Sequence, residues 1–491
     1  MQTGLDIAQS TENIIASLSY FIPEFIITVG FLLIIIIDLF MKKAERLVFF
    51  ATMFTLFLAA VAYLIQLNII QTNSLLLFNG MFLHNSYVIG FKLLALFASL
   101  LSLVFFNQDK DLKNHPKGIN DFYTIFLGGV LGLLTLISSA NLLMLFLAIE
   151  MLSIASYLMV SYTNKEKLQA EAGMKYVLFG ATASAIMLYG LTFLYGFSGT
   201  LNLYNDHIFT AFEQVNSFSA SLVLLMVLAG IGFKLSFVPF HFWTPDAYQQ
   251  APTSVSSFLS TVPKIAVFAF LFRLAAPFQL VSIHFSTIIL FAAGLTMLVG
   301  NVMAVFQKDL KRLLAYSSIG HTGFLLMLLV LPDDSTMSSN LWFYLFAYSI
   351  TNIGAFMSIA YLEESFNIKT LQQLKGLGKL NTIIAPCLVV FMVSLTGLPP
   401  TVGFMAKFVV FSSLISETTA IGFLVPILIV AVLTTVLSLF YYFNIPLHIY
   451  LKKPEQLIVK EKKSPIFDFF IIILAVIVLI AGVFPSFFKI F

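Results

Sequence analysis

Six basic side chains stand inside or beside long apolar runs of this sequence, where a charge is unexpected. They are Lys92, Lys175, Lys234, Lys264, Arg273 and Lys407. Glu150 and His321 lie in similarly apolar surroundings. Burial lowers the pKa of a lysine and a nearby carboxylate raises it again, so such a pair can capture and release a proton. Because histidine titrates near neutral pH with little perturbation, these residue types together indicate proton transfer within an apolar medium.

The apolar runs that hold these residues are long enough to cross a membrane. The chain of 491 residues is 59% hydrophobic and 10% charged, whereas a soluble globular chain carries roughly 25% charged residues. A hydrocarbon core of ~30 Å needs about twenty apolar residues in a helix. About fourteen such runs follow one another, near residues 19–40, 47–68, 86–107, 120–139, 141–162, 171–197, 220–240, 256–278, 285–306, 313–331, 339–362, 383–414, 419–446 and 467–488. The composition excludes a soluble fold and predicts an all-α polytopic membrane protein with no soluble catalytic domain.

Lysine and arginine outside these runs predict the orientation of the chain. Cytoplasmic loops hold an excess of these residues. When the loops are numbered alternately, one side holds 19 of the 26 basic residues and the opposite loops hold none, apart from Lys489 near the C-terminus. The basic side carries Lys42, Lys43, Arg46, Lys110, Lys113, Lys117, Lys165, Lys167, Lys308, Lys311, Arg312, Lys369, Lys375, Lys379, Lys452, Lys453, Lys460, Lys462 and Lys463. We therefore expect both termini on the non-cytoplasmic side of a bacterial inner membrane. The loop near 242–255 departs from this pattern, because it falls on the basic side without Lys or Arg.

Other features argue against several kinds of site. The first 18 residues carry Asp6 and Glu12 but no basic residue, so they lack the n-region of a cleavable signal peptide. Cys387 is the single cysteine, and no CxxC or His-rich spacing occurs. We therefore expect no disulfide, no metal or iron–sulfur site in this chain, and no nucleic-acid partner.

Four of the buried charges are better explained by function than by packing. Glu150, Lys234 and Lys264 lie near the middle of their predicted spans, and Lys407 lies in the twelfth span. A charged residue at the bilayer centre costs about 2.5–3.5 kcal/mol even on the lenient insertion scale. Because an ion pair at mid-membrane is a poor way to stabilise a fold, we expect these four residues to take part in transport, with Glu150 and Lys234 paired if their helices touch.

The remaining polar residues of the spans leave alternatives open. Lys92 and Arg273 lie closer to span ends, so we expect them to extend toward the headgroups as anchors. Lys175 lies near a cytoplasmic edge, where anchoring and function are equally consistent with its position. His321 is either a packing histidine or a member of a relay. Near the ends of the first span, Asp38 is expected at the interface, and Glu24 fits either role.

Two spans contain proline beside a lysine, which predicts broken helices. The seventh span reads GFKLSFVP over 232–239, and the twelfth reads GLPPTVGFMAK over 397–407. Proline inside a membrane helix frees a carbonyl that lipid cannot satisfy. The breaks are five spans apart, and an odd repeat inverts its second copy, as in transporters with a discontinuous helix at each ion site. We predict three N-terminal helices in 1–119, a first five-helix repeat in 120–278, an inverted repeat in 285–446, and a loop with a last helix in 447–491. Two ordinary proline kinks are the simpler alternative.

Four motifs resemble the antiporter-like membrane subunits of respiratory complex I. They are FLAIEMLS at 146–153, EAGMKY at 171–176, PFHFWTPDAY at 239–248 following Lys234, and KRLLAYSSI at 311–319. The resemblance runs from about residue 120 to 446. A Lys at position 407, the chain length and the number of spans make it most similar to subunit N, because subunit M typically has a Glu in the broken twelfth helix and subunit L is longer.

The resemblance implies a role for each candidate residue. Glu150 and Lys234 would form the modulating pair of a first half-channel, Lys264 the central relay residue and Lys407 the terminal proton site. Lys175 matches a lysine of the family on the sixth helix. His321 lies where related subunits often have a polar or histidine bridge.

The resemblance also implies partners and cofactors. Flavin, iron–sulfur clusters and quinone would belong to partner subunits of a proton-translocating NADH:quinone oxidoreductase, and this chain would carry none of them. Its partners would be other membrane subunits, antiporter-like and small, together with the lipid bilayer and protons. Two alternatives remain: a subunit of a multi-subunit cation/proton antiporter, and an inert membrane scaffold.

Overall fold

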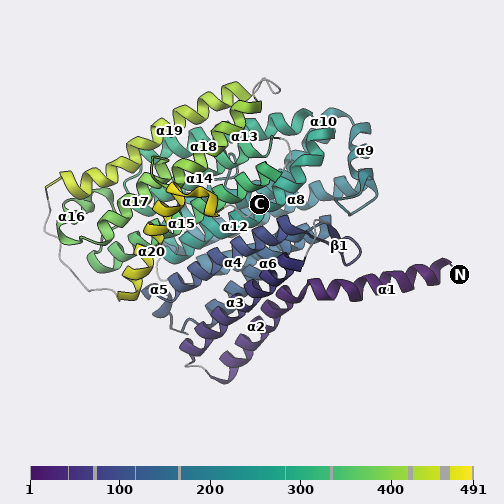
Figure 1. Ribbon diagram of the computed structural model, residues 1–491, viewed down its shortest axis with the longest axis horizontal. Coiled ribbons are helices and arrows are strands. Elements are labelled where there is room, and N and C mark those ends of the chain that lie inside the picture. Colours follow the sequence, from purple (N-terminus) through teal and green to yellow (C-terminus); the bar gives the residue numbers. More distant parts are fainter. Residues whose placement is uncertain are drawn as a thin grey trace. The chain divides into compact units, whose positions relative to one another are not determined.

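The computed structural model describes residues 2–41, 44–69, 74–116, 118–163, 167–281, 283–331, 335–417, 424–453 and 465–488. Within these ranges the chain is almost entirely helical (Figure 1). Among the described residues, twelve helices are long and apolar enough to cross a membrane. They are α2 (Ile22–Phe40), α3 (Glu45–Ile69), α4 (Ser86–Phe106), α6 (Asn120–Ser138), α7 (Leu142–Val160), α8 (Lys167–Ser198), α10 (Ser217–Leu235), α12 (Thr253–Val281), α13 (Ile283–Val305), α15 (Ser335–Phe366), α19 (Leu424–Pro446) and α20 (Pro465–Val483).

The two other predicted spans also contain helices. The tenth holds α14 (Leu310–Leu328), and the twelfth holds α17 (Ile384–Thr396) followed by α18 (Val402–Glu417). The prediction of a helical, polytopic membrane protein is therefore confirmed, while the number of fourteen crossings stays a prediction. Shorter elements connect the spans or flank them. They are α1 (Gln2–Tyr20), β1 (Leu75–Leu77), β2 (Phe82–His84), α5 (Lys110–Lys113), α9 (Asp206–Gln214), α11 (Trp243–Gln250), a 3-10 turn (Leu371–Leu374), α16 (Leu377–Leu380), a π-helical turn (Leu447–Leu451) and a 3-10 turn (Pro485–Phe488).

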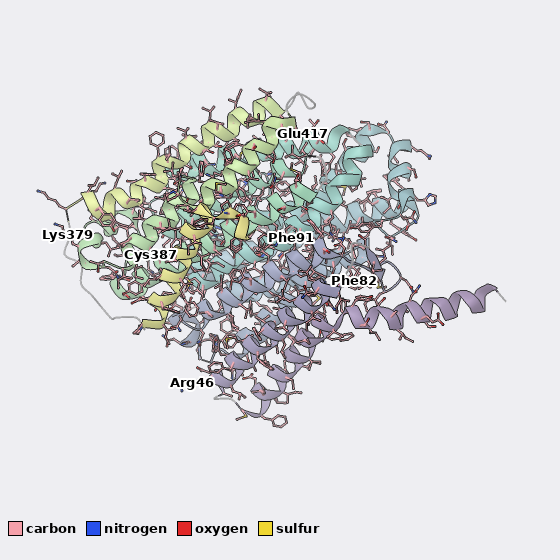
Figure 2. All side chains as sticks on the ribbon, viewed as in Figure 1. Arg46, Phe82, Phe91, Lys379, Cys387 and Glu417 are labelled. Atoms are coloured by element: carbon pink, nitrogen blue, oxygen red, sulfur yellow. The ribbon has the colours of Figure 1, made fainter. Side chains whose placement is uncertain are left out.

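The chain forms two compact units. Unit 1 comprises Met1–Asn164, Val177–Ile231 and Pro263–Ser282, and unit 2 comprises Lys165–Tyr176, Gly232–Val262 and Ile283–Phe491. Within unit 1, α2, α3, α4 and α6 run side by side (Figure 1). The antiparallel strands β1 and β2 form a hairpin between α3 and α4. Arg46, at the start of α3, and Phe82, in this hairpin, lie at opposite ends of the helices (Figure 2).

Unit 2 is built around α14 and α15, whose side chains are almost all buried. α14 packs closely on α13, because Gly300 faces Gly320 so tightly that an added Cβ would lie 2.5 Å from the Gly320 backbone nitrogen. α15 packs against α17, α18 and α20. Both helices therefore hold their polar side chains inside protein, where charged and hydroxyl groups of a membrane chain are usually found.

The first predicted break lies where α10 ends. Residues 236–242 leave the helix, Ser236 takes a left-handed conformation with φ 61°, and α11 follows. Two backbone carbonyls at the end of α10 find partners on side chains. The Trp243 indole donates to the Phe233 oxygen at 3.0 Å, and the Thr322 hydroxyl donates to the Leu235 oxygen at 3.0 Å. The break is therefore satisfied by protein, as a helix broken within a membrane requires.

The second predicted break separates α17 from α18. Gly397 ends α17 in the left-handed region with φ 89°, a conformation that glycine adopts without a Cβ penalty. The two helix segments then pack against each other, because a Cβ added at Gly403 would lie 1.8 Å from the Ser394 oxygen. The α20 helix also packs closely on this break, because a Cβ added at Gly482 would lie 2.2 Å from the Pro400 oxygen. Neighbouring helices therefore cover this break on more than one side.

Candidate proton-transfer sites

Lys234 lies in the last turn of α10, directly before the first break. It is 4% exposed, and its ammonium lies 5.7 Å from the centre of the Tyr176 ring and 5.9 Å from that of Phe233. Tyr176 also stacks on Trp243 with ring centres 4.2 Å apart. The ammonium thus faces the π-electrons of aromatic rings, which attract a cation. This arrangement holds a buried charge beside a non-helical backbone segment.

Lys407 occupies the corresponding place at the second break. It lies in α18, is 5% exposed, and donates a hydrogen bond to the Thr396 oxygen at 2.8 Å. Thr396 is the last residue of α17, so the lysine satisfies a carbonyl at the end of that segment. The Phe324 ring of α14 lies 5.1 Å from the ammonium. Both broken helices therefore place a buried lysine against an aromatic ring and beside a helix end.

His321 lies in the middle of α14 within a group of buried hydroxyls. Its Nδ1 lies 2.9 Å from the Tyr344 hydroxyl, and its Nε2 lies 3.4 Å from the Tyr442 hydroxyl, which also contacts Ser317. The Tyr348 ring is centred 5.1 Å away. Because a neutral imidazole has one donor and one acceptor nitrogen, His321 can exchange a proton with a hydroxyl on either side.

A second set of hydroxyls continues from Tyr348 toward α12. The Tyr348 hydroxyl donates to Ser318 at 2.9 Å, and the Asn352 amide contacts the Tyr348 oxygen at 3.2 Å. The same amide donates to the Ser260 hydroxyl at 2.6 Å. All of these groups are buried. The largely apolar interior of unit 2 therefore contains a hydrogen-bonded polar network.

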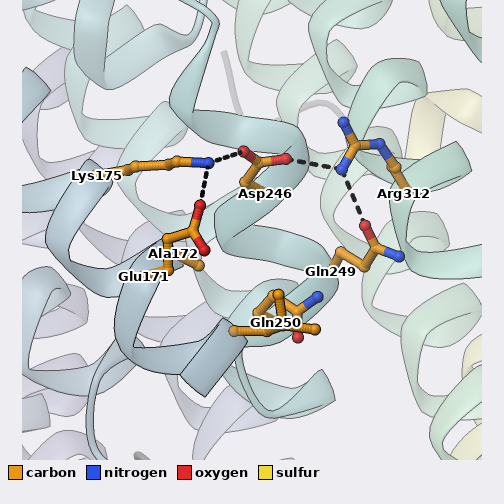
Figure 3. A pocket seen from close by; sticks show the side chains of 8 residues that line it. Glu171, Ala172, Lys175, Asp246, Gln249, Gln250 and Arg312 are labelled. Atoms are coloured by element: carbon orange, nitrogen blue, oxygen red, sulfur yellow. Dashed lines mark hydrogen bonds and ion pairs between the residues drawn. The ribbon is translucent and has the colours of Figure 1, made fainter. Parts of the chain in front are cut away.

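Lys175 lies in a different environment from the other lysines. Its side chain is 44% exposed and pairs with Glu171 at 2.9 Å and with Asp246 at 3.2 Å. Asp246 also pairs with Arg312 at 2.7 Å, and Arg312 donates to Gln249 at 2.9 Å (Figure 3). These side chains line a cavity of about 240 Å³. The loop near 242–255, which has no basic residue, thus obtains positive charge from α8 and α14.

The charge of Asp246 reflects these neighbours. Burial raises the pKa of its carboxyl, but the hydrogen bonds and positive charges of Arg312 and Lys175 outweigh burial and hold the pKa below its usual value. The carboxylate therefore stays ionised through the physiological pH range, and the two ion pairs persist.

Glu150 and Lys264 belong to unit 1. Lys264 is 1% exposed within α12. Glu150 lies in α7, and its Oε1 is buried with no hydrogen-bond partner among the described residues. Because Lys234 belongs to unit 2, the pairing of Glu150 with Lys234 stays a prediction.

The expectation that Lys92 extends toward the headgroups is wrong. Lys92 is 2% exposed in α4 and forms an ion pair with Glu24 of α2, which is 1% exposed. The Tyr63 ring of α3 lies 5.3 Å from the ammonium. The physical reason is that a carboxylate within reach offsets the cost of burying the amine. Glu24, which fitted either role, is thereby a buried partner.

Arg273 is partly exposed and binds neighbouring groups of the protein, and its expected extension toward the headgroups stays a prediction. Its guanidinium donates to the Ile137 oxygen at 2.6 Å, to the Ser139 oxygen at 3.0 Å and to the Tyr204 hydroxyl at 2.8 Å. Arginine presents several donors in a planar fork, so one side chain satisfies the carbonyls at the end of α6 and fixes the loop that carries Tyr204. Its role is structural.

Sequence reasoning missed the polar partners of the candidate lysines. Asp246, Arg312 and the serines at 317 and 318 stood in the quoted motifs, but their contacts depend on helices far apart in the chain. Tyr344, Tyr348, Tyr442 and Asn352 carried no signal, because a tyrosine or asparagine in an apolar run is common. Among the described residues, no group of three or more His, Cys, Asp or Glu side chains could hold a metal ion.

Comparisons with known proteins show the family to which the chain belongs. A family model described as NADH:quinone oxidoreductase/Mrp antiporter, TM, matches residues 139–438. The NADH-quinone oxidoreductase subunit N 2 of Chloroherpeton thalassium is 36% identical over 448 residues, covering 89% of this chain and 86% of the relative. Subunit N of Bacillus anthracis is 36% identical over 464 residues, covering 92% and 90%.

A solved structure shares both the fold and detectable sequence similarity. A chain of respiratory complex I from Thermus thermophilus matches with a TM-score of 0.78 and 29% identity, covering 94% of this chain and 97% of that chain. A chain of the Mrp complex from Dietzia sp. has the same fold, with a TM-score of 0.78 at 18% identity. On its motifs, its fold and these relatives, the chain belongs to the NADH:quinone oxidoreductase/Mrp antiporter transmembrane family and is an antiporter-like membrane subunit of the subunit N type.

Proposed function

We propose that this chain translocates protons as subunit N of a bacterial NADH:quinone oxidoreductase, using Glu150, Lys234, Lys264, His321 and Lys407. The observation that carries the proposal is the placement of Lys234 and Lys407, each buried beside the end of a broken helix. A half-helix end at an ion site is the design of membrane transporters. Since lipid penalises buried charges, two lysines kept in such places favour a transport role.

Each residue has a proposed task. Glu150 modulates the proton affinity of Lys234 in a first half-channel, and Lys264 passes the proton onward. His321 connects this lysine with Lys407, the terminal site of the second half-channel. The hydroxyls on both sides of His321 support a relay there.

The redox chemistry takes place in other chains. Flavin, iron–sulfur clusters and quinone are proposed to bind to partner subunits, and electron transfer there would shift the Glu150–Lys234 pair. The partners are other antiporter-like and small membrane subunits. The proposed location is the bacterial inner membrane, with both termini on the non-cytoplasmic side and the basic loops in the cytoplasm.

Proton pumping by vesicles containing the complex tests the residue roles. With Lys234→Ala or Lys264→Ala, NADH-driven proton uptake into inverted vesicles should fall by about 10-fold or more, a lower bound set by the loss of a proton-transferring group. The amount of assembled complex should stay unchanged. Lys379→Ala, which removes an exposed lysine, is the matched control and should pump normally. Normal pumping by both buried-lysine variants would refute the relay.

A cation/proton antiporter subunit is the alternative function, because the family model includes Mrp antiporters. Sodium-dependent transport in the absence of NADH oxidation would favour this alternative. Copurification with flavin-containing peripheral subunits would favour the oxidoreductase. The subunit N relatives, similar over about nine-tenths of the chain, support the oxidoreductase. The inert scaffold predicts that neutralising the buried lysines leaves transport intact.

A further inference from the structure

Two helices that line a charged pocket, α8 and α11, also carry Tyr176 and Trp243, two of the aromatic rings packed near the buried Lys234. The pocket is lined by Lys175 of α8, Asp246 of α11 and Arg312 of α14 (Figure 3). Its volume of about 240 Å³ leaves space for several water molecules at ~30 Å³ each. Lys234 is not one of the residues that line this pocket.

Three aromatic rings pack together beside Lys234, next in the chain to residues of the pocket. Tyr176 follows Lys175 in α8, and Trp243 precedes Asp246 by about one turn of α11. Tyr176 and Trp243 stack at 4.2 Å, and Phe233 contacts them at 5.7 Å and 5.1 Å. All three are at most 3% exposed. The indole N–H of Trp243 is bonded to the Phe233 oxygen, so the Tyr176 hydroxyl is the proton-carrying group that these three side chains add to the stacked rings.

The ion pairs in the pocket hold two of these rings together. Lys175 and Asp246 bond at 3.2 Å and so join α8 to α11 next to Tyr176 and Trp243. Arg312 bonds to the other carboxylate oxygen of Asp246 at 2.7 Å and joins α11 to α14. The bond between Lys175 and Glu171 is different, because both residues belong to α8. Among the ion pairs of this pocket, the bond between Lys175 and Asp246 is the one that joins the helices of Tyr176 and Trp243.

We propose that Tyr176, Phe233 and Trp243 form a gate between the charged pocket and Lys234, and that the ion pairs of Asp246 keep it closed. The pocket is then a water-filled entrance, and the gate separates it from Lys234 until α8 and α11 move apart. Asp246 and Arg312 are positioning residues, because they act through the rings and not on the proton. This inference rests on the proposed role of Lys234.

The reactivity of a cysteine at position 234 measures whether the gate is open. Cys387→Ser removes the single native thiol, and Lys234→Cys adds a reporter. A small water-soluble methanethiosulfonate is added to inverted vesicles, and the initial rate of labelling is measured. Native gel electrophoresis of the same vesicles reports that the complex is assembled. The parent reporter should react slowly.

Asp246→Asn should raise the labelling rate about fivefold, the Boltzmann factor of one exposed ion pair at the upper end of its measured range. Trp243→Ala should raise it further, because it removes a ring. Glu171→Gln is the matched control, since it removes the carboxylate that bonds Lys175 within α8, and it should not change the rate. Tyr176→Phe keeps the ring and should also leave the rate unchanged.

Two outcomes would overturn the gate. One is a parent reporter that reacts as fast as the Trp243→Ala variant, and the other is an equal rate for Asp246→Asn and Glu171→Gln. Failure of the proposed function looks different: Lys234→Ala vesicles would pump normally whatever the labelling rates are. If Lys234→Ala abolishes pumping but Asp246→Asn leaves the labelling rate unchanged, the proposed function stands and only the gate is wrong.

Discussion

Three buried lysines of this chain each lie next to an aromatic ring. Lys92, Lys234 and Lys407 each have an aromatic ring centred between 5.1 Å and 5.7 Å from the ammonium. A cation–π contact contributes about 0.5–2 kcal/mol, whereas burying an ion costs several kcal/mol. The ring therefore offsets only part of the cost of burial, and the remaining part falls to other groups, the Glu24 carboxylate for Lys92 and the Thr396 oxygen for Lys407.

Glu24 and Lys92 give a prediction at the scale of single residues. Removing one partner leaves the other charge buried without compensation, which typically costs about 3–5 kcal/mol. Glu24→Gln or Lys92→Met should therefore reduce the amount of assembled subunit and its thermal stability. The double variant Glu24→Gln/Lys92→Met removes both charges and should recover most of the loss. Thermal denaturation in detergent, followed by native gels, measures both effects.

A different result would change the interpretation of this pair. If the double variant is no more stable than the single variants, the pair is not held mainly by charge compensation. If it is stable but pumps fewer protons per NADH, the pair belongs to the transport machinery.

The residues that the sequence revealed were those whose charge conflicts with their surroundings. Lys234, Lys264 and Lys407 could be selected because an ammonium in an apolar run is costly wherever the chain folds. Their partners could not be selected in this way. The Thr396 oxygen that binds Lys407 is an ordinary backbone atom, and it becomes a partner only because α17 ends there.

At the scale of helices, the two breaks have similar local structures. Each contains a cis X–Pro peptide, Val238-Pro239 in the first and Pro399-Pro400 in the second. Each also uses side chains to bind backbone carbonyls at the end of the preceding helix. The prolines predicted both positions, because a proline removes a donor from the helix. The bounds of the gaps were not predictable, since they depend on which neighbouring side chains reach the carbonyls.

Gly403 gives a prediction about the second break. An added Cβ would lie 1.8 Å from the Ser394 oxygen, so Gly403→Ala must push α18 away from α17. We expect a loss of about 1–3 kcal/mol, typical of overpacking, together with reduced pumping. Thermal denaturation of the purified complex and proton uptake by vesicles measure the two effects.

Gly196 in α8 provides the matched control for this substitution. An added Cβ there meets nothing within 4 Å, so Gly196→Ala should be neutral or slightly stabilising, by at most about 1 kcal/mol. Equal behaviour of the two alanine variants would show that the contact between α17 and α18 yields without cost.

At the scale of the whole molecule, the loops predict a topology that fusions can test. Alkaline phosphatase folds only outside the cytoplasm. Fused after Asn205, in a loop without lysine or arginine, it should be active, and fused after Lys379, in a basic loop, it should be inactive. The opposite result would show that the chain has the reverse orientation in the membrane, and the two sides of the proposed half-channels would then be exchanged.

The predicted repeats and the compact units are two different divisions of the molecule. The predicted repeats, 120–278 and 285–446, follow the order of the helices, whereas the compact units combine separate segments. Unit 2 takes residues 165–176 and 232–262 from the first predicted repeat. Composition and spacing report the order of the spans along the chain, while compactness depends on side-chain contacts. The repeats therefore stay a prediction about sequence and not about packing.

One helix of unit 2 touches every element of the proposed transport path in that unit. From α14, Arg312 holds Asp246, His321 joins the hydroxyls, Thr322 binds the Leu235 oxygen next to Lys234, and Phe324 faces Lys407. A small rotation or axial shift of α14 would disturb all four contacts at the same time. We therefore expect a displacement of α14 to change the surroundings of Lys234 and Lys407 together, so the two lysines can be coupled by movement of one helix before any proton is transferred.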